Sequence, residues 1–291
     1  MNVTGLTSAR VRMGRRFRFA RTRSAKVGLL LGGLLVLLAL IGPFFAPHTP
    51  SEPVGVPFAT PSSDAVLGTD LLGRDVLSRI LWGGRSVLSL SIAATLIAYV
   101  VGLTIGLVAG YTRSIVDGIL MRAMDVLLAF PALLFLLVIV TGAGHSKIAL
   151  ILGVATVHLP GIARIVRAAT LEVSVRSYVE AAVARGERTS SLLWHEILPN
   201  TLGPVFADAG IRLTGSILLI ASVNFLGLGL QPPAADWALM ISENRGGITL
   251  QPWVIAVPTL LLATLTISVN LVADAIARSM GTSTEGTQVT R

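Results

Sequence analysis

The stretch EAAVARGERTSSLLWHEILPN, residues 180–200, decides the fold because it is a polar segment set between two long apolar runs. Its composition predicts a helix ending near Arg185, a break at Gly186 and a second short helix before Pro199, since glycine suits the break between helices and proline ends them. Two short helices at an angle form a rigid knob that can seat in a cleft of another protein. The stretch therefore indicates a membrane protein with a partner in the adjacent water.

The same segment gives more detail about these two helices. The first is expected over Glu172–Arg185, and the small residues around Ala182 allow another surface to approach its backbone closely. The second is expected over Ser191–Ile197, with the hydroxyl of Thr189 or Ser190 as its cap.

The rest of the chain is apolar enough to cross a membrane several times. Of its 291 residues, 53% are hydrophobic and 13% charged, whereas a soluble domain carries roughly 25% charged residues. About 20 apolar residues cross a bilayer, and each crossing segment must be helical because a helix satisfies its own backbone groups. We therefore predict an all-α membrane protein with six transmembrane helices: Val27–Phe45, Ser86–Gly110, Ile119–Val140, Ile148–Val166, Leu202–Leu230 and Trp253–Ala275.

The basic residues orient these spans. Residues 1–26 hold eight basic residues and no acidic one. If this tail is cytoplasmic, alternation places 18 of the 23 Lys and Arg residues inside, Arg212 included, as the positive-inside rule expects. Both termini are then cytoplasmic. We interpret the tail as a topology signal, and docking on anionic lipid or on a partner is the alternative.

The segments between the spans follow from this arrangement. Residues 46–85 form an external segment that is extended at first and then helical over 71–82, where apolar residues recur at helical spacing. Residues 86–280 form a five-helix core, and residues 167–201 are its large internal loop. The polar residues 281–291 are expected to form a disordered cytoplasmic tail.

The second span carries Gly102, Gly106 and Gly110 on one helical face. Small residues at this spacing let two membrane helices approach closely. We expect the face to pack against a helix of this chain or of a second subunit, and a hinge is the alternative.

Several polar residues fall within the predicted spans. Asp125 is expected to pair with Arg122 near the inner surface, with a role along a transport path as the alternative. Pro131 is expected to kink the third span. His158 is interpreted as a satisfied structural group, although it could face a path.

Four stretches together resemble one protein family. EAA at 180–182, followed by Gly186 and by LP at 198–199, resembles the loop through which ABC importer permeases contact their ATPase subunits. LGTDLLGRDVLSR (67–79), MRAMDVLLAFP (121–131) and NFLGLGLQPP (224–233) resemble the second permease subunit of oligopeptide, dipeptide and nickel importers, the permease C type.

The resemblance extends over about residues 25–280, nearly the whole chain, and includes Asn270 and Asp274 of the last span. The sequence departs from the family pattern at Glu196, Ala238 and Ala273. Only the first departure bears on the ATPase contact.

This resemblance implies a type I ABC importer permease fold in the bacterial cytoplasmic membrane. It implies a similar second permease, two ATPase subunits or a fused pair, an external substrate-binding protein and a peptide substrate. The ATPase-coupling residues that it implies are Glu180, Ala181, Ala182, Gly186, Leu198 and Pro199.

The external face offers candidates for a gate or a contact with the binding protein. Asp70, Arg74 and Asp75 are spaced to pair along one or two helical turns, together with Arg79. They mark either a surface near the docking site or a self-paired helix that braces the external mouth. The remaining candidates, which a plain helix end would also explain in part, are Gly227, Gly229 and Trp237.

Catalytic motifs are missing from the sequence. It contains no GxxxxGK[ST] loop, no HExxH, no GxSxG and no cysteine. We therefore expect a non-enzyme without a cofactor or metal of its own, with ATP and Mg held by partner ATPase subunits. Import of nickel or another small solute is the alternative within the family. A self-contained secondary transporter is the alternative from another class, and it would need intramembrane ion sites and repeats.

Overall fold

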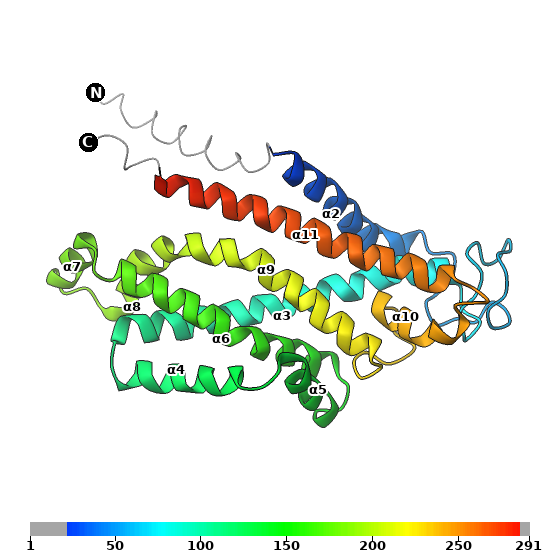
Figure 1. Cartoon of the computed structure of the whole chain (residues 1–291), viewed down its shortest axis with the longest axis horizontal. Helices are drawn as coiled ribbons and strands as arrows, with labels where there is room; N and C mark the ends of the chain where they lie inside the picture. Colours follow the sequence, from blue (N-terminus) through cyan, green and yellow to red (C-terminus); the bar gives the residue numbers. More distant parts are fainter. Residues whose placement is uncertain (1–21, 286–291) are drawn as a thin grey trace.

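Residues 22–285 are described by a computed structural model, and within them the chain consists of helices and connecting loops (Figure 1). The only extended pairings among these residues are two isolated bridges, Pro53–Arg74 and Thr69–Asp75. The predicted all-α architecture is confirmed. The helices are α2 (Arg23–Ile41), η2 (Gly42–Phe44), α3 (Val76–Thr112), α4 (Ile115–Leu128), α5 (Ala132–Gly142), α6 (Lys147–Val173), α7 (Ser177–Ala184), α8 (Thr189–Ser191), the π-helix η3 (Leu192–Ile197), α9 (Leu198–Phe225), α10 (Trp237–Asn244), η4 (Arg245–Gly247) and α11 (Trp253–Glu285).

Five helical segments in the described part of the chain are long and apolar enough to cross a membrane. They contain α2, α3, α6, α9 and α11. A sixth crossing arises if α4 and α5 are taken together as one bent span. The chain is thus a multi-pass membrane protein with five or six spans.

The expected third span, Ile119–Val140, is not one helix. α4 ends at Leu128, α5 begins at Ala132, and the two axes differ by 90°. Pro131 stands at the break as the N-cap of α5, with φ −58° and ψ 123°. Proline lacks an N–H and disfavours the helical region for the residue before it, so the predicted kink is a full break.

The separate surface helix predicted over residues 71–82 is wrong. α3 starts at Val76 and continues without interruption to Thr112. The carboxylate of Asp75 accepts the N–H groups of Leu77 and Ser78, which fixes the start of α3. Gly73 has φ +73°, outside the right-handed helical region, so residues 71–74 stay in a turn.

Helix also extends into both predicted tails. α2 begins at Arg23, within the expected tail 1–26, and α11 reaches Glu285, within the expected tail 281–291. The hydroxyl of Thr22 caps α2 by accepting the Ala25 N–H. The remainder of the two tails, residues 1–21 and 286–291, lies outside the described residues.

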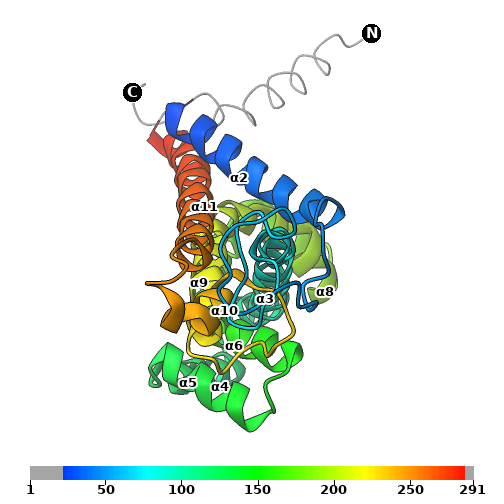
Figure 2. The same cartoon turned by 90° about the vertical axis from the view of Figure 1, so that its right-hand side faces the viewer.

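α3 is the central helix of the bundle (Figure 2). It packs along α6, and α9 lies against both of these helices. α11 covers α9 and α2, while α4 and α5 pack beside α6. This arrangement places α3, α6 and α9 around the middle of the molecule.

Two structures occupy opposite ends of the bundle (Figure 1). The knob comprises residues 174–197, which include α7, α8 and η3. The cap comprises residues 46–75 together with α10. The C-terminal end of α11 lies toward the knob end, where Arg278 Nη2 donates to Ser24 Oγ at 3.3 Å.

Candidate functional site

The first half of the knob is a helix closed by a glycine. The Gly186 N–H donates to Val183 O at 2.9 Å, and the Glu187 N–H donates to Ala182 O at 3.2 Å. These two bonds and the φ of +76° at Gly186 define a Schellman motif. A Cβ at Gly186 would have no neighbour within 4 Å, so the backbone conformation rather than space demands glycine here.

The second half of the knob begins with a helix whose N-cap differs from the predicted one. Arg188, rather than Thr189 or Ser190, is the N-cap of α8, and no side chain caps this helix. The helix therefore starts one residue earlier than a Thr189 cap would require, and two earlier than a Ser190 cap.

Pro199 does not end the second helix as predicted. The π-helix η3 continues into α9, and the Leu198 N–H donates to Leu193 O, five residues earlier. Pro199 lies in the first turn of α9, where a missing N–H is tolerated. The second half of the knob, α8 and η3, therefore forms one continuous helical segment with α9, Thr189–Phe225.

Most residues expected to contact an ATPase lie at the surface of this knob or of the first turn of α9. The exposed ones are Glu180, Ala181, Gly186 and Pro199, and Leu198 is half-buried. Ala182 differs, because it is fully buried in a cluster with Leu192 and Ile197. Its side chain is not available to a partner, and its small size serves close packing within the knob.

Large apolar side chains are also exposed on the knob. Trp194 is 60% exposed and Val183 51%, and Val175 and Tyr178 are exposed too. Exposed apolar groups gathered beside charged ones are typical of protein contact sites. The knob thus presents a mixed surface suited to a partner.

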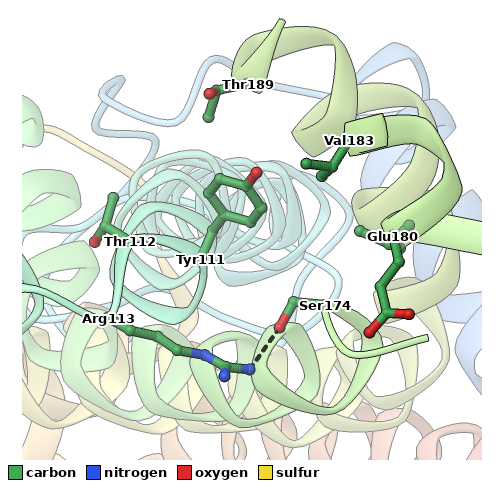
Figure 3. A pocket seen from close by; sticks show the side chains of 8 residues that line it. Tyr111, Thr112, Arg113, Ser174, Glu180, Val183 and Thr189 are labelled. Carbon is green, nitrogen blue, oxygen red and sulfur yellow. Dashed lines mark hydrogen bonds between the residues drawn. The ribbon is translucent and has the colours of Figure 1, made fainter. Parts of the chain in front are cut away.

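An open hollow of about 590 Å³ separates the knob from the C-terminal end of α3 (Figure 3). Arg113 ends α3 in the left-handed conformation, and its Nη2 donates to Ser174 Oγ at 2.8 Å. Figure 3 shows Glu180 and Val183 on the α7 side of the hollow and Tyr111 on the α3 side. A side chain of a partner could enter here and contact both elements.

The glycine face of α3 lies against α6 of the same chain. A Cβ at Gly106 would lie 2.5 Å from Val166 Cβ and 2.7 Å from Ala163 O. Similarly close contacts with α6 occur at Gly102 and Gly110. The backbones of α3 and α6 therefore approach each other closely. α3 itself extends from the cap at Val76 to the hollow beside the knob at Thr112.

The cap contains a buried ion network. Arg74 Nε and Arg79 Nη1 donate to Asp70 Oδ2 at 2.7 and 2.5 Å. Arg74 Nη2 and Arg79 Nη1 also donate to Glu243 Oε2 at 2.9 and 2.6 Å. The Arg79 side chain is 0% exposed. The Asp75 carboxylate caps α3. These residues therefore match a self-paired segment that braces the external mouth better than they match a docking surface.

Glu243 completes the network, yet no local signal in the sequence could have identified it. It is separated from Arg79 by 164 residues. Only the folding of α10 onto α3 brings the two side chains together.

Trp237 and the glycines near the end of α9 also belong to internal packing. Trp237 is fully buried, its Nε1 donates to Ile80 O at 2.9 Å, and its ring fills the space above Gly83. Gly229 packs against the Asn224 side chain. Gly227 has φ +75° with open space around it, so its glycine serves the turn.

Asp236 is a buried acid within this end of the molecule. Complete burial raises the pKa of its carboxyl to about 6, although the N–H groups of Leu239 and Ala238, the Asn224 side chain and the charge of Arg79 act in the opposite direction. The carboxylate still caps α10 by accepting both of those N–H groups.

Two expectations about polar residues in the spans need correction. Asp125 pairs with Arg164 of α6, at 2.5 Å from Nη2 to Oδ1, instead of Arg122. Arg122 and Asp125 lie on one helix, and α6 presents a closer cation. Arg212 lies in the middle of α9 and not in an internal loop, so it does not contribute to the charge asymmetry of the loops.

Residues 102–282 match the family described as binding-protein-dependent transport system inner membrane component. Residues 12–62 match the N-terminal TM domain of oligopeptide transport permease C. The first match includes the knob, the glycine face and the last three long helices.

Curated relatives cover nearly the same stretch. The Di/tripeptide transport system permease protein DppC of Pseudomonas aeruginosa is 36% identical over 265 residues, which is 89% of this chain and 88% of that protein. The Glutathione transport system permease protein GsiD of Pectobacterium atrosepticum is 34% identical and covers 89% of this chain and 87% of its own length. The Oligopeptide transport system permease protein OppC of Haemophilus influenzae is 30% identical, with coverages of 89% and 84%.

A solved structure shares the fold. A chain of the inward-facing MetNI methionine ABC transporter aligns with a TM-score of 0.55 at 21% identity, covering 69% of this chain and 96% of that chain.

Proposed function

The chain belongs to the binding-protein-dependent transport system inner membrane components, as an ABC importer permease of the dipeptide and oligopeptide family, and we propose that it forms half of a pore that imports short peptides. The observation that carries this proposal is the 36% sequence identity to a di- and tripeptide permease protein, which extends over 89% of this chain. A homologous permease would supply the other half, and an external binding protein would deliver the peptide.

The proposed motor consists of two ATPase subunits that hold ATP and Mg and contact the knob. Three features of the knob support this. Glu180 and Ala181 are exposed on one helix, Trp194 is exposed on the next, and the hollow beside Tyr111 is open to a partner. Because η3 continues into α9, a displacement of the knob would move a membrane span directly.

The proposed topology places the knob and both termini in the cytoplasm and the cap outside. The knob carries the exposed arginines Arg176 and Arg185, as the positive-inside rule favours for a cytoplasmic segment. The knob and the C-terminal end of α11 share one end of the bundle, which suits a common side of the membrane (Figure 1).

Peptides are proposed as the substrate instead of nickel because the relatives described above are named for di- and tripeptides, glutathione and oligopeptides. A peptide needs a hydrated path with few tight contacts, since a conducting site must release what it binds.

Reconstitution tests the proposal. The chain, its partner permease and the ATPases are co-expressed, purified and placed in liposomes with the loaded binding protein. We expect ATP-dependent uptake of a labelled tripeptide and none without the ATPases. Uptake driven by an ion or proton gradient in the absence of ATPases would instead indicate a secondary transporter.

A further inference from the structure

A group of polar side chains lies where α3, α6 and α9 meet. Tyr99 Oη donates to Asp208 Oδ2 at 2.8 Å, and Arg212 Nε donates to the same oxygen at 3.0 Å. Arg212 is near the midpoint of α9, roughly 20 Å from either end at a rise of 1.5 Å per residue. The pair therefore lies deep in the bundle, where charged groups are costly and serve a partner or a path.

The outer edge of the Arg212 guanidinium faces the backbone of α6. A Cβ at Gly161 would lie 2.5 Å from Nη2 and 2.7 Å from Nη1, so a larger residue here would displace the guanidinium. Within residues 22–285, the hydrogen bonds and ion pairs of Arg212 involve Nε and Asp208 alone. Nη1 and Nη2 have no protein acceptor in this part of the chain.

His158 adds a second unsatisfied group to the same place. It is 7% exposed, and its Nε2 has no hydrogen-bond partner among the described residues. Its ring lies against Gly215 of α9. A buried polar atom without a partner is uncommon in native proteins and calls for an explanation, such as a water, an ion or a ligand that binds there.

The N–H groups of Arg212 that have no protein acceptor favour a ligand with hydrogen-bond acceptors. Asp208 Oδ2 already accepts two hydrogen bonds, whereas two nitrogens of Arg212 still offer N–H donors. The Arg212 side chain is also the more exposed of the pair, at 24% against 11% for Asp208. Guanidinium N–H groups without a protein acceptor are suited to a carboxylate, which such a group can bind through two parallel bonds.

We propose that Arg212 contacts the C-terminal carboxylate of the peptide as it passes through the pore, and that the permease thereby selects substrates independently of the binding protein. This inference rests on the proposed function. Asp208 compensates part of the charge of Arg212, which keeps the contact weak enough for the peptide to leave again.

Uptake of two tripeptides tests this contact: Ala-Ala-Ala with a free carboxylate, and the same peptide with a C-terminal amide. Uptake of each is measured in the reconstituted complex, and the acid-to-amide ratio is compared between the native protein and Arg212→Gln. The preference of the binding protein cancels because it is identical in both complexes. We expect the ratio to fall about tenfold, the scale of a charge-assisted pair.

Two further variants keep the test decisive. Arg164→Gln removes an exposed arginine from α6 and should leave the ratio unchanged. Asp208→Asn combined with Arg212→Gln removes both charges, so no lone charge stays buried if the single variant fails to assemble. This double variant should show the same tenfold fall.

The outcomes distinguish a failure of the carboxylate contact from a failure of the proposed function. A native ratio in Arg212→Gln or in the double variant, with acid uptake still measurable, overturns the carboxylate contact and leaves the proposed function standing. A native complex that imports neither peptide contradicts the proposed function, and the contact with it.

Discussion

The cap and the knob both carry many charged residues, but they place them differently. In the cap, Asp70 is completely buried and pairs with Arg79 at the start of α3, which is also buried and pairs with Glu243 of α10 as well. In the knob, Arg176 is exposed and pairs with the exposed Glu172 at the end of α6, and Arg185 pairs with Glu187 at the surface. The charges of the cap hold its own segments together, whereas those of the knob remain available to a partner.

This difference shows how charge in a loop should be interpreted. LGTDLLGRDVLSR and EAAVARGERTSSLLWHEILPN both resemble contact surfaces in the sequence. The structure uses the charges of the first internally and exposes those of the second. The cap is thus a rigid unit fixed to the start of α3, and the knob is a surface fixed to the start of α9.

The largest effect on stability is expected from Asp70→Asn. Among residues 22–285, this change leaves the buried Arg74 and Arg79 with Glu243 as their only carboxylate, and removing one partner of a buried network costs about 3–5 kcal/mol. Thermal unfolding of the purified complex would measure it. Glu180→Gln is the control in the knob, where an exposed change stays within about 0.5 kcal/mol. Equal shifts for the two variants would contradict the comparison.

The second prediction is that stability at the cap end of the molecule depends on pH through Asp236, the N-cap of α10. The raised pKa of Asp236, about 6, means that the folded state keeps its proton up to that pH, while the unfolded state loses it near 3.8. The contribution of this group to stability is therefore full below about pH 4 and is lost as the pH rises through 6, with a ceiling of roughly 3 kcal/mol.

Asp236→Asn isolates that contribution because asparagine can still accept the N–H groups of Ala238 and Leu239. We expect the stability difference between the native protein and this variant to change between pH 4 and 6. A constant difference across that range would show that Asp236 does not titrate there.

A third effect concerns the helix that joins the two regions. Gly106→Leu should separate α3 from α6, since even a Cβ there would meet Val166 at 2.5 Å, and overpacking costs typically 1–3 kcal/mol. Gly118→Leu on α4 is the matched control, because a Cβ at Gly118 has no neighbour within 4 Å. The yield and thermal midpoint of the two variants provide the measurement, and similar values would mean that the glycine face tolerates bulk.

The sequence was sufficient where a property depends on neighbouring residues. The apolar runs predict the spans, and Gly186 marks a break that the structure realises as a left-handed turn. The small residues of the α3 face predict close helix contact, because their four-residue spacing already defines one face.

The sequence was insufficient where partners are distant along the chain. Asp125 pairs with Arg164 instead of its neighbour Arg122, and Arg79 pairs with Glu243. Ala182 looks like a contact residue in a small-residue helix, yet it is buried because η3 folds back onto α7. Pro199 fails to end its helix since a π-turn precedes it. The three results on Asp125, Arg79 and Ala182 depend on tertiary contacts that one sequence does not encode locally.

The smallest effect on stability should come from Gly186→Val, about 1–2 kcal/mol, because a side chain at positive φ is strained but meets no neighbour. Gly144→Val is its matched control. Gly144 also has a positive φ, +85°, with no atom within 4 Å of its Cβ position, and it lies away from the knob in the turn between α5 and α6. The two variants therefore carry the same backbone strain at different places.

The central claim, that the knob couples ATP hydrolysis to transport, is tested most directly by the ATPase activity of these two complexes with and without loaded binding protein. For Gly186→Val we expect stimulation by the binding protein and peptide uptake to fall together by about fivefold or more, with docking of the binding protein retained. For Gly144→Val we expect native stimulation and uptake. Full stimulation and uptake in Gly186→Val would contradict the assignment of the knob as the coupling element.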